Sequence, residues 1–211
     1  AIRIEGSVDS VLMQKAFDFL IERHEAFRMN FVESDSKPLI RTVKNRNVRL
    51  QLRKVDDTEI EALIPQIVRE QTLLPFRLES DVLLRISLLS GTHQNALVLS
   101  FHHAVIDRVS IPILIRELCE VYSQLHRGST PQLPALNVEY CDYANWQRTT
   151  FSEKSLTQDL EYWQKLLKSS EVLELPTDRP RPKTPTFRGK RLRFKFSEEE
   201  SALVRQFTKA Q

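Results

Sequence analysis

The order of hydrophobic and polar residues along the chain predicts interleaved amphipathic helices and strands. Apolar residues recur at helical spacing over Val8–Arg23 and again over Ile111–Leu125, where Gly128 is well placed to end the helix. Two apolar runs, Val82–Ser90 and Asn95–Phe101, flank a glycine-containing turn and are typical of paired, largely buried strands. The pattern therefore predicts a mixed α/β protein.

Weaker patterns complete the predicted order of elements. Thr58 and Glu61 are spaced as a capping box, so we expect a helix to begin there and to kink or break at Pro65. Leu175–Pro185 carries four prolines and is expected to be an extended crossover. Further strands are expected at Phe27–Val32, Pro38–Thr42, Val48–Lys54 and Arg191–Phe196, and further helices at Glu139–Thr149, Glu153–Lys168 and after a cap formed by Ser197 and Glu200.

Composition narrows the classes of function. The 211 residues include 31 basic and 28 acidic side chains, and their even mixture gives a net charge of +3 and argues against a nucleic-acid binder. No apolar run approaches the ~20 residues that span a bilayer. The chain does not begin with Met, so we expect it to be part of a longer protein. The two cysteines, Cys119 and Cys141, form no CxxC pair, and we expect two reduced, buried thiols.

The residues with the clearest chemical potential follow the second apolar run. His102 and His103 come directly after a predicted buried strand, and Asp107 lies four residues further on. Successive residues of a strand point to opposite faces, so only one of the two imidazoles can face a given site. This geometry disfavours joint metal ligation, and no metal site is expected. On spacing alone, a structural role and a catalytic role both remain open.

Several segments resemble motifs of the condensation domains of nonribosomal peptide synthetases, within the chloramphenicol-acetyltransferase-like superfamily. The pair His102-His103 with Asp107 is similar to the signature HHxxxDG, and the other matches cover nearly the whole chain in the family's order. These matches are Arg23–Phe31 with RHExLRTxF, Pro75–Leu78 and Leu83–Arg85 with PFDL…PLLR, Tyr140–Gln147 with YxDYAxWQ, Tyr162-Trp163 and Leu173–Pro182 with the region before the crossover, and Phe187–Gly189 with FxG.

The resemblance implies a fold, a reaction and partners. Residues 1–185 would form the N-terminal lobe of a condensation domain, a chloramphenicol-acetyltransferase-like lobe with a mixed sheet flanked by helices. Residues 186–211 would form the crossover and the start of a truncated C-terminal lobe. The complete domain would join a donor acyl or peptidyl thioester to an acceptor aminoacyl thioester in the cytoplasm. It would bind no cofactor, because the substrates are attached to the phosphopantetheine of donor and acceptor carrier domains. An adjacent adenylation domain and the missing C-terminal lobe are further expected partners, with neither nucleic acid nor membrane involved.

The resemblance also implies roles for individual residues. His103 would accept the amine's proton, position the amine or stabilise the tetrahedral intermediate, while His102 would support the loop. Asp107 would be structural, with Arg28 as its expected cationic partner, and Ser110 would cap the following helix. Arg108 stands where the family has glycine, at a position where a positive φ would strain an arginine and where its long cation would reach the channel.

Other expectations from the sequence stay open. The aromatic residues Tyr143, Trp146, Tyr162 and Trp163 are expected to pack in a core. Three alternative functions remain open. The chain could belong to a stand-alone acyltransferase that uses coenzyme A, to a sibling epimerisation domain, or to a degenerate docking or scaffold module, which Arg108 suggests.

Overall fold

The computed structural model describes residues 1–151, 153–171, 173–186, 189–190, 192 and 194–210, which fall into two compact units, 1–156 and 157–211. The first unit is built on a four-stranded sheet of order β1-β6-β5-β4. Its strands are β1 (Ile2–Glu5), β4 (Leu50–Lys54), β5 (Leu84–Ser90) and β6 (Gln94–Phe101). All pairs are antiparallel except β4 with β5, so the sheet is mixed as expected.

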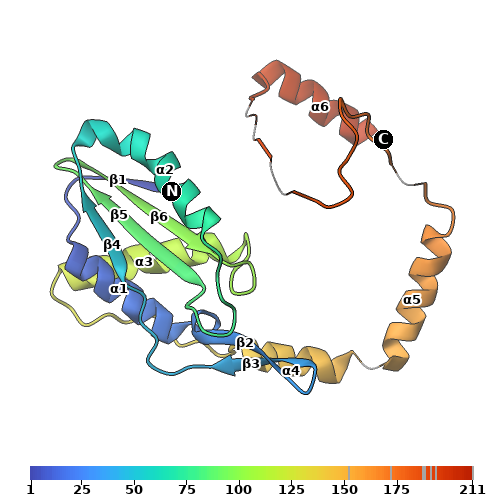
Figure 1. Cartoon of the computed structure of the whole chain (residues 1–211), viewed down its shortest axis with the longest axis horizontal. Coiled ribbons are helices and arrows are strands. Elements are labelled where there is room, and N and C mark those ends of the chain that lie inside the picture. The colour runs from blue at the N-terminus through green and yellow to red at the C-terminus, as the bar shows by residue number, and fades with distance from the viewer. Residues whose placement is uncertain (152, 172, 187–188, 191, 193, 211) are drawn as a thin grey trace. The chain divides into compact units, whose positions relative to one another are not determined.

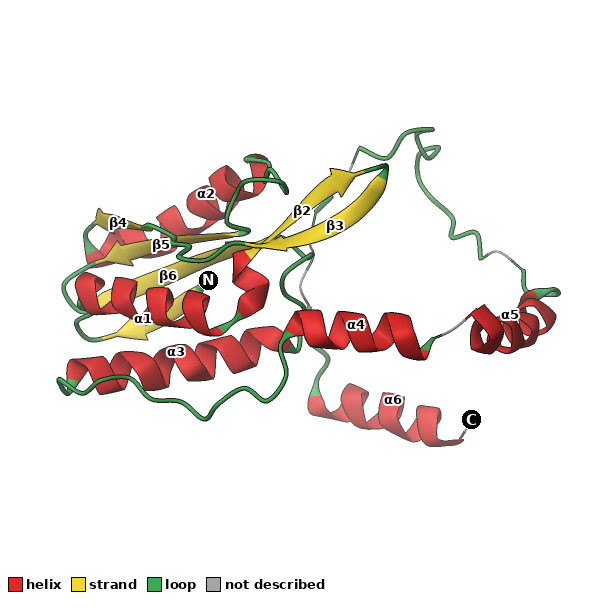
Figure 2. Ribbon diagram, turned by 90° about the horizontal axis from the view of Figure 1, so that it is seen from below, coloured by secondary structure: helices red, strands yellow, loops and turns green. Residues whose placement is uncertain are grey.

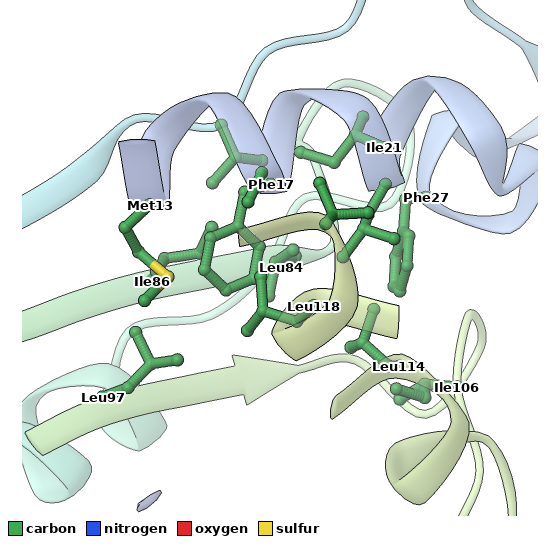
Figure 3. Close-up of a cluster of buried hydrophobic side chains, with 14 of the residues drawn as sticks. Met13, Phe17, Ile21, Phe27, Leu84, Ile86, Leu97, Ile106, Leu114 and Leu118 are labelled. Atoms are coloured by element: carbon green, nitrogen blue, oxygen red, sulfur yellow. The ribbon is translucent and has the colours of Figure 1, made fainter. Parts of the chain in front are cut away.

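Helices cover both faces of this sheet (Figures 1 and 2). The helices α1 (Ser10–Arg23) and α3 (Ser110–His126) lie on one face, and α2 (Ile60–Leu73) lies on the other. Each face of the sheet carries its own hydrophobic core, and β6 contributes to both because its side chains alternate between the faces. Leu97 packs with α1 and α3, while Ala96 and Val98 pack with α2. Figure 3 shows the larger core, whose labelled residues are Met13, Phe17, Ile21, Phe27, Leu84, Ile86, Leu97, Ile106, Leu114 and Leu118.

The helix ends follow from particular side chains. Asp9 Oδ1 accepts hydrogen bonds from the backbone N–H groups of Val11 and Leu12 and so caps α1. The predicted capping box of Thr58 and Glu61 is wrong, because the reciprocal pair is Asp56 and Glu59 at the short 3-10 helix η2 (Asp57–Glu59). Asp56 precedes that turn in the extended backbone that a capping residue needs.

Two further expectations about helices have clear outcomes. The helix α2 does not break at Pro65, since it runs through this proline from Ile60 to Leu73, and the alternative expectation of a kink there stays a prediction. Gly128, at φ +75°, follows α3 and terminates it as predicted, in a backbone conformation that favours glycine.

The remaining elements of the first unit lie beside the sheet. The segment predicted as a strand at Phe27–Val32 begins with a 3-10 helix, η1 (Glu25–Arg28), and becomes extended only at β2 (Met29–Ser34). β2 pairs with β3 (Lys37–Thr42) in an antiparallel hairpin. The helix α4 (Tyr140–Thr150) matches its predicted range closely, and α5 (Glu153–Leu167) crosses the boundary between the units.

The second unit contains the end of α5, an extended segment and α6 (Glu198–Ala210). Leu175–Pro185 forms neither helix nor strand, as its prolines predict. Ser197 Oγ accepts from the Glu200 backbone N–H and Glu200 Oε2 from the Ser197 N–H, so the predicted cap of α6 is confirmed. The strand predicted at Arg191–Phe196 includes residues 191 and 193, which lie outside the described residues.

Two predictions of burial are wrong. Tyr143, Trp146, Tyr162 and Trp163 are between 44% and 61% exposed, because α4 buries none of its residues and the described side chains of α5 are all exposed. Both cysteines are free thiols, but Cys119 is exposed and Cys141 is only partly buried. No helix in the described part of the chain is long and apolar enough to cross a membrane. The boundary predicted at residue 185 between two lobes of a condensation domain stays a prediction.

Candidate active site

The two histidines leave the sheet at the end of β6 and line different cavities. The His102 backbone N–H still donates to Leu83 O (3.0 Å), so the pairing of β5 with β6 extends to this residue. His102 lines a cavity of about 460 Å³ on the α2 side, together with Gln71, Phe76 and Ser100. His103 lines a different cavity of about 240 Å³. The expectation that the two imidazoles face different surroundings is therefore met.

The His103 cavity is formed by three segments of the first unit. Ala26 comes from η1, Tyr140 from the start of α4, and Val105, Asp107 and Ser110 from the loop and helix after the histidines. His103 itself is exposed, so its imidazole can be reached from solvent. A neighbouring apolar cavity of about 290 Å³ shares four of the lining residues, namely Ala26, Val105, Ile106 and Ser110.

Asp107 joins the loop after the histidines to the first residue of α3. Its Oδ1 accepts hydrogen bonds from the Ser110 hydroxyl (2.6 Å) and from the Ser110 backbone N–H (2.8 Å). These bonds hold the pKa of the Asp107 carboxyl below its ordinary value. Asp107 is therefore a carboxylate at neutral pH and accepts hydrogen bonds there. The expectation that Ser110 caps the helix is wrong, because α3 begins at Ser110 with Val109 at the N-cap position, and the Ser110 hydroxyl donates to Asp107.

The expected pair of Asp107 with Arg28 is not found among the described ion pairs. Arg28 Nε instead donates to Ile21 O (3.2 Å), at the end of α1. Asp107 is exposed and satisfied by Ser110, so it needs no cationic partner. Arg28 supports the turn between α1 and β2 and lies outside the cavity that His103 lines.

Arg108 occupies the glycine position of the motif without backbone strain. It is exposed, and it is not among the residues with positive φ, which are Asp35, Ser36, Asn45, Gly6 and Gly128 in the described part of the chain. The expected penalty of a left-handed arginine is therefore wrong for this loop. Arg108 does not line the His103 cavity either.

Sequence reasoning missed the acid that organises the start of the motif at Arg23–Phe31. Glu117, on α3, accepts from Arg23 Nε (3.2 Å) and lies 2.7 Å from His24 Nε2. The Arg23 and Glu117 side chains are only 12% and 14% exposed. Glu117 lies between the core residues Leu114 and Leu118 on the predicted helix, and this position was the available signal.

Glu25, in η1, joins its own segment to β3 and α4. Its Oε1 accepts from Thr42 Oγ1 of β3 (3.2 Å), and its Oε2 accepts from the backbone N–H of Cys141 at the start of α4 (3.2 Å). Arg23, His24 and Glu25 thus tie the end of α1 to α3, β3 and α4. This is a structural role for all three residues.

The two thiols are expected to react at different rates with iodoacetamide at pH 8. Burial and the neighbouring Glu25 raise the pKa of the Cys141 thiol, so a smaller fraction of it is the reactive thiolate. Peptide mass spectrometry should show Cys119 alkylated first, and both thiols alkylated alike once urea unfolds the protein. Earlier labelling of Cys141 in the folded protein would contradict the structure.

The sequence and the fold of the chain are similar to those of known proteins. The chain resembles the X-domain from teicoplanin biosynthesis with a TM-score of 0.76 and 23% identity, over 88% of this chain and 42% of that one. It is 35% identical to a linear gramicidin synthase of Brevibacillus parabrevis over 90% of this chain, and 32% identical to the probable non-canonical nonribosomal peptide synthetase CymA of Salinispora arenicola over 97%.

The fold is that of the condensation-domain class, a mixed sheet flanked by helices. The family model described as "Condensation domain" matches residues 1–211. The chain belongs to the condensation-domain family, and its homologues are parts of nonribosomal peptide synthetases. It spans only 2–3% of the length of these two relatives and about two fifths of the solved structure.

Proposed function

We propose that the domain containing this chain forms an amide bond between two carrier-bound thioesters, with His103 as the residue that acts on the attacking amine. The observation that carries this proposal is the exposed imidazole of His103 in a cavity at a rigid strand end. Its neighbour His102 lines a different cavity, so one imidazole is free for substrate.

In the proposed reaction, the main task of the protein is to hold the amine and the thioester at attack distance. The acceptor's α-amine attacks the donor thioester carbonyl carbon, the carbon–nitrogen bond forms, and the carbon–sulfur bond then breaks. An α-amine has a reference pKa of ~7.7–8.0, so a sizeable fraction is already neutral at pH 7. Holding both reactants at attack distance can lower the barrier by up to ~7–11 kcal/mol.

His103 would handle the proton and the charge of this step. An imidazole with a reference pKa of ~6.5 can accept the proton that the amine nitrogen loses and return it to the leaving thiolate. It can also position the amine or stabilise the charged tetrahedral intermediate. Asp107 and His102 would hold the loop, and no covalent intermediate on the protein is required.

The partners follow from the same proposal. Donor and acceptor carrier domains would present the substrates on phosphopantetheine, and an adenylation domain would load them. The remaining lobe of the domain would complete the channel around His103. This domain would bind no cofactor of its own.

A transfer assay with the complete domain tests the proposed function. A loaded donor carrier and a loaded acceptor carrier are mixed with the domain, and intact-protein mass spectrometry follows the donor group. We expect the product on the acceptor carrier. Product formed only when coenzyme A thioesters replace the carriers would indicate a stand-alone acyltransferase, epimerised but untransferred donor would indicate an epimerisation domain, and no product would favour a scaffold module.

Replacement of Arg108 by glycine is expected to leave the rate of amide formation unchanged. The Arg108 backbone is unstrained and its side chain lies outside the His103 cavity, so glycine relieves nothing at the site. Urea unfolding should show a loss of at most about 1 kcal/mol, because glycine adds freedom to the unfolded chain. A clear fall in transfer rate would show that Arg108 is an adapted part of this site.

A further inference from the structure

The end of α2 is held by a residue from the neighbouring strand. Arg85 of β5 donates from Nη1 to the carbonyl oxygens of Gln71 (2.9 Å) and Leu74 (2.7 Å), and from Nη2 to that of Pro75 (2.8 Å). Carbonyls at a helix C-terminus lack partners within the helix and carry partial negative charge. The guanidinium therefore fixes the backbone that leads from α2 to Phe76.

Phe76 lies in contact with Arg85 and His102. The Arg85 Cζ is 3.7 Å from the centroid of the Phe76 ring, a close cation–π contact. The centroids of Phe76 and His102 are 6.1 Å apart and the ring planes meet at 82°, which is a favoured perpendicular arrangement. Both Phe76 and His102 are partly buried, so these contacts restrict the rotation of the His102 ring.

The His102 ring in turn determines the backbone that carries His103. Its Nδ1 accepts a hydrogen bond from the Ala104 backbone N–H (3.1 Å), and its carbonyl accepts from the Val105 N–H (3.1 Å). An accepting Nδ1 carries no proton, so the neutral ring has its proton on Nε2. The turn around His103 thus depends on the orientation and the tautomer of its neighbour.

Gln71 links the same three elements from inside. Its Oε1 accepts from Ser100 Oγ of β6 (2.6 Å), and its Nε2 donates to Ser87 Oγ of β5 (2.7 Å). Gln71 is buried, so these bonds hold the end of α2 against the strand that ends at the histidines. The Arg85–Phe76–His102 contacts therefore have a rigid base.

We propose that Phe76 and Arg85 are positioning residues, which hold the His102 ring in the orientation and tautomer that direct the backbone turn at His103. The effect of this turn on catalysis rests on the proposed role of His103. The orientation of the His102 ring does not depend on that role, since it follows from the contacts of the ring with Phe76.

Phe76→Leu tests the proposal, with Phe76→Tyr as its matched control. In the complete domain, ¹⁵N spectra of labelled histidine should show His102 Nδ1 as an unprotonated acceptor. The leucine variant should mix the two tautomers and lower kcat by about two- to tenfold with little change in KM for the carriers, as expected for one lost aromatic contact. The tyrosine variant keeps the ring and should behave like wild type. Arg85→Lys, which loses the two-armed guanidinium, should shift the His102 resonances in the same direction.

The two proposals fail in different ways. A folded Phe76→Leu variant with unchanged His102 resonances would overturn the positioning role, and so would equal losses of kcat in the leucine and tyrosine variants. If the resonances shift as expected while His103→Ala transfers at the wild-type rate, the positioning of His102 stands and the proposed function of His103 fails.

Discussion

Glu117→Gln is expected to destabilise the folded domain by about 2 kcal/mol, because hydrogen bonds to charged groups contribute ~1.5–3 kcal/mol. Glu117 is the shared partner of Arg23 and His24, and its side chain is only 14% exposed. The amide keeps the size of the carboxylate but removes its charge. The Arg23 guanidinium would then stay largely buried with only uncharged acceptors, namely the new amide oxygen and Pro134 O, which lies 2.7 Å from Arg23 Nη2.

Urea unfolding of the complete domain measures this loss, and Glu120→Gln is its matched control. Glu120 lies on the same helix but is exposed, and its bond is to Gln124 one turn later. The control should change the free energy of unfolding by less than about 0.5 kcal/mol. Equal effects of the two substitutions would show that the Arg23–Glu117 pair contributes nothing special to the fold.

His103→Ala is expected to slow amide formation by about 100-fold or more, the usual lower range for a lost proton-transfer group. The imidazole is exposed and lines the cavity without packing in the core, so its removal should leave the fold intact. His93→Ala is a suitable control, because His93 is also exposed but lies in the turn between β5 and β6, at the opposite end of β6 from His103. That variant should transfer at the wild-type rate.

Much of the sheet and its helices could be predicted because burial imposes a period. The runs Val82–Ser90 and Asn95–Phe101 became β5 and β6, and the stripe after Ile111 became α3. The residues at which individual helices begin were harder to predict. Asp56 rather than Thr58 begins the turn before α2, since the choice depends on backbone geometry that several polar residues in a row could adopt. Ile111 fits the helical period and yet is 42% exposed, because the core side of α3 is set by Leu114, Leu118 and Val121.

The candidate site shows which relations a sequence hides. Strand alternation led us to expect that His102 and His103 face different surroundings, although β6 ends at Phe101 and His103 lies in the turn that follows. The hydrogen-bond partner of Asp107 was predicted wrongly. The orientation of Arg28 depends on the turn η1, and the actual donor is Ser110, three residues after Asp107. Glu117 contacts Arg23, which is 94 residues away, and Arg85 contacts carbonyls that are 10 to 14 residues away. The helical pattern places Glu117 between core residues, but it does not identify the partner of either side chain.

The rate of a single turnover with His103→Ala tests the central claim most directly. The complete domain is mixed with saturating loaded donor and acceptor carriers, and product on the acceptor carrier is followed by rapid quench and mass spectrometry. We expect a first-order rate at least about 100-fold below wild type, with the His93→Ala control unaffected. A His103→Ala variant that transfers at the wild-type rate would contradict it.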